Sequence, residues 1–111
     1  MSDYKAPLRD IAFSLNEVLN YTEHCQRIGA TEVNEELASA ILEEAAKFAE
    51  NVIAPLNKIG DQEGCQWSEG SVSTPSGFKE AYTQFVEGGW PGLPMPEEYG
   101  GQGLPGSLNF A

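Results

Sequence analysis

The chain has 111 residues, which is enough for one small domain and too few for two. Its 17 acidic residues outnumber its 6 basic residues and leave a formal net charge of -11. This charge excludes electrostatic attraction to nucleic acid or to an anionic lipid surface.

The sequence shows no targeting or membrane segment. No apolar run approaches the roughly 20 residues that a membrane-spanning helix needs, and no signal peptide follows Met1. We therefore expect a soluble protein with a cytoplasmic location. Cys25 and Cys65 lie far apart and form no CxxC motif, so we predict two buried, reduced thiols rather than a disulfide.

The first 30 residues contain one clear helix signal. Apolar residues recur at helical spacing behind Pro7 and predict a short helix over residues 8–20. Residues 21–30 carry scattered polar groups and predict a loop or a short helical turn. We interpret residues 1–30 as an N-terminal extension and residues 31–111 as a partial helical domain that ends in a Gly/Pro-rich segment.

The strongest element is an amphipathic helix over residues 35–55. Asn34 is a good N-cap, and two glutamates follow it in the first turn, where the helix dipole favours acids. Glu43 is placed to pair with Lys47 one turn later. Pro55 predicts a kink or an end between residues 52 and 57. The apolar stripe consists of Leu37, Ile41, Ala45, Phe48, Val52 and Leu56.

The next segment, residues 57–74, loses helical periodicity and gathers glycines and serines, so it predicts a loop. A third helix is expected over residues 75–88, behind Thr74 and Pro75, and the pair Gly88–Gly89 should end it. No long alternating apolar run indicates a strand. The sequence therefore predicts an all-α fold without a significant sheet.

The C-terminal tail has an unusual composition. Residues 88–106 hold seven glycines and four prolines, a density that excludes a helix or a central strand. Yet the tail also carries apolar residues without any period, and such residues need a surface to pack on. We expect the tail to lie over the helices or a neighbouring molecule. The candidates for a domain interface are Trp90, Leu93, Met95, Tyr99 and Leu104.

Motifs that suggest chemistry are weak on inspection. The glycine pattern of residues 101–106 matches a dinucleotide fingerprint, but no strand precedes it and Pro105 interrupts it. The acids of residues 61–63 resemble a calcium loop without its remaining ligands, and they indicate a solvated turn. His24 and Cys25 are neighbours that point apart, and we expect His24 to be exposed or hydrogen-bonded structurally. We predict no catalytic, cofactor-binding or metal-binding residue in the chain.

Three segments carry a resemblance to a known family. They are Phe-Ala-Glu-Asn-Val-Ile-Ala-Pro-Leu at 48–56, Gly-Phe-Lys-Glu-Ala-Tyr at 77–82, and Gly-Trp-Pro-Gly-Leu-Pro-Met-Pro-Glu-Glu-Tyr-Gly-Gly-Gln-Gly-Leu at 89–104. Together they resemble the N-terminal part of the flavin-dependent acyl-CoA dehydrogenases. The opening residues 4–19 resemble the N-terminal extension of one bacterial subgroup, which includes enzymes similar to 3-methylmercaptopropionyl-CoA dehydrogenase.

The resemblance implies an oxidoreductase of fatty acid metabolism whose polypeptide is much longer. In this family a following β-domain holds much of the FAD site. A C-terminal helical bundle carries the glutamate that removes the α-proton of an acyl-CoA, while a β-hydride passes to FAD. Electron-transferring flavoprotein is the usual acceptor, and the enzyme is expected to be a homo-oligomer. None of these later motifs lies in the chain, so we expect a colourless, inactive structural fragment. The alternative is a free-standing acidic helical module that binds a partner protein through its tail.

Overall fold

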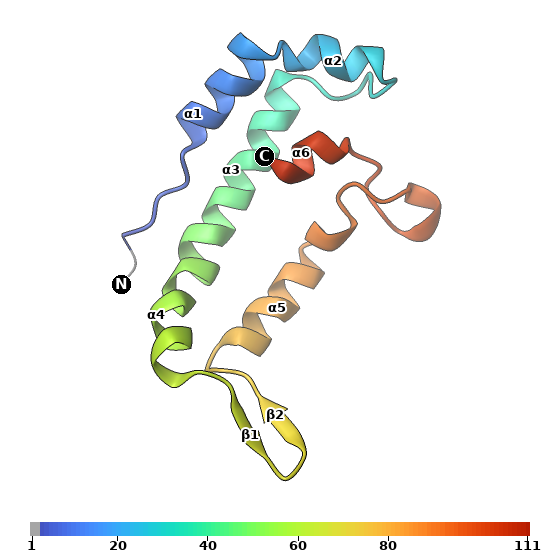
Figure 1. Ribbon diagram of the computed structural model, residues 1–111. Helices are drawn as coiled ribbons and strands as arrows, with labels where there is room; N and C mark the ends of the chain where they lie inside the picture. The colour runs from blue at the N-terminus through green and yellow to red at the C-terminus, as the bar shows by residue number, and fades with distance from the viewer. Residues whose placement is uncertain (1–2) are drawn as a thin grey trace.

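The computed structural model describes residues 3–111 and is mostly helical, which confirms the predicted fold class (Figure 1). Within residues 3–111, two short strands are the only regular elements that are not helical. In chain order the elements are α1 (Leu8–Ala12), the π-helical turn η1 (Phe13–Val18), α2 (Tyr21–Arg27), α3 (Glu35–Phe48), the π-helical turn η2 (Ala49–Ile53), α4 (Ala54–Glu63), β1 (Gln66–Ser68), β2 (Ser71–Ser73), α5 (Phe78–Glu87), the 3₁₀ turns η3 (Trp90–Gly92) and η4 (Glu97–Tyr99), and α6 (Gly106–Phe110).

The N-terminal region contains more helix than the sequence predicts. The first helix is confirmed, because α1 and η1 together run from Leu8 to Val18. A seven-residue helix, α2, replaces the expected loop or short turn of residues 21–30. Tyr21 and Cys25 lie one turn apart on α2 and are both buried. Tertiary packing of this one apolar edge therefore stabilises a helix whose overall pattern is weak.

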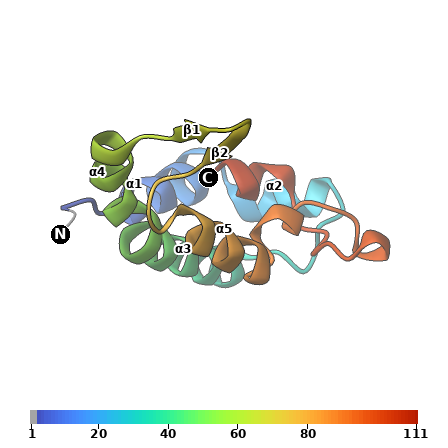
Figure 2. The same ribbon diagram turned by 90° about the horizontal axis from the view of Figure 1, so that it is seen from below.

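The central helix begins as predicted and ends later. Asn34 caps it, because its side-chain Oδ1 accepts the backbone N–H of Leu37 at 2.8 Å. Of the kink or end predicted between residues 52 and 57, the end is wrong, since α4 continues the helical run to Glu63, whereas a π-helical turn and a bend of the axis do fall there. The loop expected from residue 57 is therefore wrong as well. Pro55 lies in the first turn of α4, directly after η2, where a missing N–H costs little. Figure 2 shows α4 turning away from the axis of α3.

The apolar face of α3 is rotated relative to the predicted stripe. The fully buried residues are Ala38, Leu42 and Ala46, whereas the predicted stripe is only half-buried. Neighbouring segments cover one flank of the stripe and leave the other open. The predicted pair of Lys47 with Glu43 is also wrong, because the Lys47 Nζ lies 2.5 Å from Glu44 Oε1. That hydrogen bond raises the pKa of Lys47.

A hairpin and α5 follow α4. Residues 66–73 of the predicted loop pair as an antiparallel hairpin in which Trp67 lies opposite Val72. The two turn residues, Glu69 and Gly70, both have positive φ, of 49° and 79°, which matches the twist of a tight hairpin. Helix α5 starts at Phe78, three residues after the predicted start, and gives way to Gly88 as expected.

The two cysteines differ in their surroundings. Both are free thiols, as predicted. Cys25 is fully buried in the core, but Cys65 is exposed, so the prediction of burial was wrong for Cys65. Cys65 follows α4 at the start of the hairpin, where no other segment covers it.

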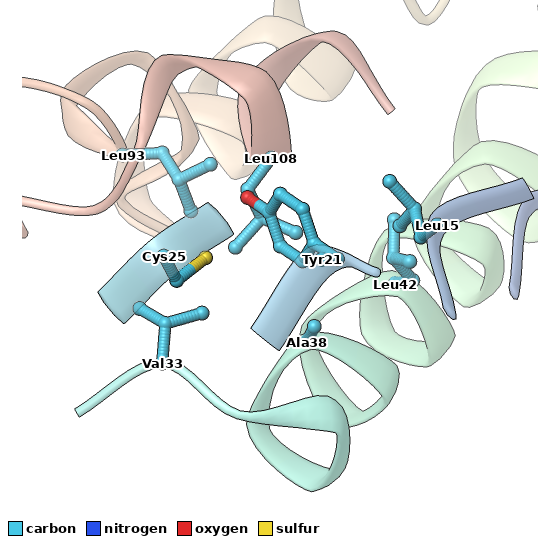
Figure 3. Packing of buried hydrophobic residues seen from close by; sticks show 8 residues of the cluster. All are labelled: Leu15, Tyr21, Cys25, Val33, Ala38, Leu42, Leu93 and Leu108. Carbon is cyan, nitrogen blue, oxygen red and sulfur yellow. The ribbon is translucent and has the colours of Figure 1, made fainter. Parts of the chain in front are cut away.

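The core lies where α2, the first half of α3 and α6 meet, at one end of the molecule in Figure 1, and Figure 3 shows its side chains from close by. It joins α2 and the first half of α3 to residues of the tail and α6, so the extension and the domain proposed from the sequence share it. The division at residue 30 stays a prediction. The buried cluster consists of Leu15, Tyr21, Cys25, Val33, Ala38, Leu42, Leu93 and Leu108.

The overall shape is flat and open. The molecule extends over 53 × 36 × 17 Å and has a radius of gyration of 17.1 Å. A compact chain of this length has a radius of gyration of about 13 Å. Its accessible surface is 8046 Å², whereas a compact monomer of this mass exposes about 6,000 Å². A large share of the surface of the helices is therefore not covered by other segments of the chain.

Candidate functional site

The tail forms a closed loop rather than an extended strand. Backbone hydrogen bonds join its two limbs: Gln102 N–H donates to Gly92 O at 2.9 Å, and Leu104 N–H donates to Leu93 O at 3.0 Å. Between them, Gly103 N–H donates to Met95 O at 2.8 Å. The ends of residues 92–104 therefore lie close together, as in an Ω-loop, and we call this segment the tail loop.

Glycine is required where the limbs of the tail loop meet. A Cβ atom at Gly101 would lie 2.1 Å from the carbonyl oxygen of Met95. This distance is too short for any residue with a side chain. The neighbouring Gly100 has a φ of 84°, in the region that favours glycine. The glycines thus permit a close approach of the loop to itself. This packing accounts for Gly100 and Gly101 of the Gly-Gly-x-Gly pattern.

The tail loop divides the five interface candidates into two groups. Leu93 is buried in the core cluster, and Trp90 and Leu104 pack half-buried against it. Met95 and Tyr99 point outward and are 51% and 81% exposed. The structure therefore brings three candidates together on the core and leaves two as an outer apolar surface.

Beside the tail lies a groove with a volume of about 330 Å³. Ile41 and Ala45 of α3 form one wall, Phe85 of α5 and Trp90 form another, and residues of α6 close one end. All four named side chains are only half-buried. The groove is therefore an apolar surface that could take an apolar segment.

The segment before α1 bounds the same groove and is held by one carboxylate. Glu50 Oε1 accepts the backbone N–H of Ala6 at 2.9 Å, and Glu50 Oε2 lies 3.3 Å from Lys5 Nζ. The hydrogen bond from the Ala6 N–H makes the largest contribution to lowering the pKa of Glu50, and Lys5 makes a smaller one. Glu50 thus fixes the N-terminal segment across the end of α3.

A second hollow of about 620 Å³ opens between α2 and α6. There the hydroxyls of Tyr21 and Ser107 lie 2.9 Å apart and link the two helices. Burial raises the pKa of Tyr21 despite this hydrogen bond. His24 is exposed, as expected, and stacks on Tyr21 with ring centroids 6.0 Å apart. Phe110 is 91% exposed at the rim.

Ionisable groups do not converge in residues 3–111. No group of three or more His, Cys, Asp or Glu side chains in this range is arranged to hold a metal ion. The acids interpreted as a solvated turn, Asp61 and Glu63, lie instead in the last turn of α4. Within the same range, no helix combines the length and the apolar character needed to cross a membrane.

Sequence reasoning missed the groove and the link between Tyr21 and Ser107. The link joins residues 86 positions apart, and the groove is lined by residues of the N-terminal segment, α3, α5 and α6, so no local pattern could indicate either. The four-residue spacing of Tyr21 and Cys25 was the one available signal, because it places two apolar side chains on the same face of a helix.

Two curated proteins are similar to this chain over nearly all of its length. A 3-methylmercaptopropionyl-CoA dehydrogenase of Ruegeria pomeroyi is 42% identical over 102 residues, which cover 92% of this chain and 17% of that protein. FadE5 of Mycobacterium tuberculosis, a broad-specificity linear acyl-CoA dehydrogenase, is 28% identical over 113 residues, which cover 100% of this chain and 18% of that protein. The chain thus spans less than a fifth of the length of these relatives.

The family model described as "Acyl-CoA dehydrogenase, N-terminal domain" matches residues 35–109. The match begins with the first residue of α3 and extends into α6, so it includes the tail loop and most of the groove. The resemblance inferred from the glycine-rich tail is thereby confirmed. The chain belongs to the acyl-CoA dehydrogenase N-terminal domain family.

Proposed function

We propose that these residues are the N-terminal helical domain of a larger flavin-dependent acyl-CoA dehydrogenase, in which they dock other domains and perform no catalytic step. The observation that carries this proposal is the open shape: the accessible surface is 8046 Å², about 2,000 Å² more than a compact monomer of this mass exposes. A helical domain whose apolar faces are covered by other parts of one enzyme has this property.

In the proposed enzyme the chemistry belongs to other parts of the polypeptide. FAD, the acyl-CoA thioester and the glutamate that removes the α-proton are assigned to those parts, as family membership implies. Electron-transferring flavoprotein is the proposed electron acceptor, and a cytoplasmic homo-oligomer is the proposed assembly. A catalytic base needs a pKa matched to its task and a fixed position beside the substrate. We propose that no carboxylate of residues 3–111 acts as this base.

The tail loop and the groove have separate roles in this proposal. Leu93, Trp90 and Leu104 attach the tail loop to the core, where they fix its position. Met95 and Tyr99 are then held on the outside, available to a neighbouring domain. The half-open groove between α3 and α5 receives a second apolar segment. Covering such side chains contributes about 1.5–3 kcal/mol for each large group that becomes fully buried.

A chimera with the Ruegeria pomeroyi relative tests the proposal directly. Residues of this chain replace the 102 matched residues of that enzyme, and the purified chimera is desalted and examined for flavin absorbance and acyl-CoA-dependent dye reduction. We expect retained yellow colour and activity within about tenfold of the parent. The 111-residue chain alone, soaked with FAD and desalted, should stay colourless.

The matched control carries an unrelated acidic helical domain of equal length at the same position. If the chimera retains no more flavin or activity than this control, the docking role is overturned. Stoichiometric FAD on the 111 residues alone would overturn the assignment of the cofactor to other domains. A free-standing interaction module, the alternative raised by the sequence, predicts that the chimera behaves like the control.

A further inference from the structure

The hairpin carries an exposed apolar pair that neither the core nor the groove uses. Trp67 and Val72 lie directly opposite each other in the register of β1 and β2. Their side chains are 73% and 68% exposed. Figure 1 shows the hairpin projecting from the helical body beyond the ends of α4 and α5. Trp67 therefore contributes nothing to the interior of this domain.

The hairpin is held in place at both ends. At its tip, the turn residues Glu69 and Gly70 adopt the positive φ values that a two-residue turn requires. At its base, Glu63 Oε2 accepts the backbone N–H of Ser76 at 2.8 Å and its hydroxyl at 2.9 Å. An isolated two-stranded hairpin is only marginally stable in water. These contacts thus maintain a platform that presents an aromatic side chain to solvent.

The negative charge around the hairpin favours a partner surface that is positively charged. Between Lys58 and Lys79 the chain contains three acids, Asp61, Glu63 and Glu69, and no basic residue, and Glu69 is the charged residue of the hairpin itself. A second copy of the chain is a poor partner, because each copy has a net charge of -11 and three of its six basic residues already pair with its own acids. Opposite charge at the rim of an interface favours the partner that supplies it.

We propose that the hairpin is a docking arm whose Trp67 and Val72 enter an apolar pocket rimmed by lysine or arginine. This pocket lies on the assembled dehydrogenase outside these 111 residues, so the inference rests on the proposed function. Tryptophan is enriched among the residues that dominate binding when they fill a desolvated pocket. Glu69, in the turn that joins β1 and β2, meets the basic rim, and its negative charge disfavours acidic surfaces.

Hydroxyl-radical footprinting read by mass spectrometry tests the docking arm, because it reports the oxidation of each tryptophan separately. The probe is the full-length chimera with the Ruegeria pomeroyi relative, compared with the 111-residue chain. We expect the oxidation rate of Trp67 to fall at least fivefold in the chimera. An unchanged rate in a chimera that holds flavin overturns the docking arm and leaves the proposed function intact.

Charge variants test the basic rim. Glu69→Lys in the chimera should restore most of the oxidation of Trp67, whereas the control Glu69→Gln should restore little. Equal effects of the two variants would overturn the rim. Protection of Trp67 in the 111-residue chain alone, rising with its concentration, would instead identify a second copy as the occupant and overturn the proposal. Flavin content measured on every sample separates these outcomes from a failure of the chimera itself.

Discussion

The two ends of this domain are built from similar helices but differ in how they are stabilised. At one end, α2, the first half of α3, the tail loop and α6 enclose the buried cluster. At the other end, η2, α4, the hairpin and α5 bury no hydrophobic side chain, and Pro75 is the one buried residue among 47–92. We call these regions the core end and the open end.

The open end is held mainly by local contacts. Its ring contact to α3 is the tilted pair of Phe48 and Phe85, with centroids 6.2 Å apart, and Gly60 permits the close approach of Phe78 to α4. Short helices in proteins gain most of their stability from tertiary packing of an apolar face. The helices of the open end bury no such face and therefore lack most of this stabilisation. Secondary structure alone therefore does not complete this domain, and under the proposed function docked domains contribute most at the open end.

The largest expected effect comes from the side chain that attaches the tail loop to the core end. Leu93→Ala removes a side chain that is only 5% exposed, and we expect it to lower the free energy of unfolding by about 2–5 kcal/mol. Met95→Ala, in the same loop but 51% exposed, is the matched control and should cost much less. Urea denaturation followed by circular dichroism measures both, and equal losses would contradict the division of the tail loop.

A smaller loss is expected where the tail loop crosses itself. Gly101→Ala places a methyl group against the Met95 carbonyl, and the forced backbone shift should cost about 1–3 kcal/mol. Gly106→Ala adds the same methyl group at the start of α6, where nothing lies within 4 Å, and should be neutral or slightly stabilising. Thermal unfolding measures the stability of both variants, and equal effects of the two substitutions would contradict the loop geometry.

At the open end we expect local rather than global effects. Glu69→Asn relieves a non-glycine residue at a φ of 49° and should stabilise the hairpin by about 1 kcal/mol. Because the hairpin is not packed on the core, the urea midpoint of the whole chain should not move. Slower amide exchange of residues 66–73, followed by NMR, is the expected sign. A shift of the global midpoint would show that the two ends unfold as one unit.

The smallest effect concerns the clasp at the base of the hairpin. The N–H and hydroxyl of Ser76 lower the pKa of Glu63 below its ordinary value. The clasp therefore stabilises the hairpin fully at neutral pH, and this contribution is lost as the pH falls through the lowered pKa of the folded state. Amide exchange of Ser76, corrected for intrinsic rates, should accelerate only once the pH falls below the ordinary pKa of a glutamate. Glu63→Gln should remove most of this pH dependence, and a wild-type response in the variant would assign it elsewhere.

Much of the local structure was predictable because its causes lie within a few residues. Asn34 and the two glutamates that follow it indicated the start of α3, and Gly88 indicated the end of α5. The failures also have local explanations. Pro55 reads as a helix breaker, but the preceding π-helical turn places it in a first turn that tolerates it. The hairpin was missed because three-residue strands give no measurable alternation.

The sequence by itself determined the helical class, the acidic surface and the family, since composition, periodicity and the glycine-rich motif are properties of neighbouring residues. Only the tertiary structure decided which tail residues are buried. Leu93 and Tyr99 look equally apolar in the sequence, yet one is 5% and the other 81% exposed. The hydrogen bonds that close the tail loop orient them, and the surfaces left open at the other end depend on which segments the fold places beside them. Burial depends on contacts across the whole chain, and residue order alone does not supply those contacts.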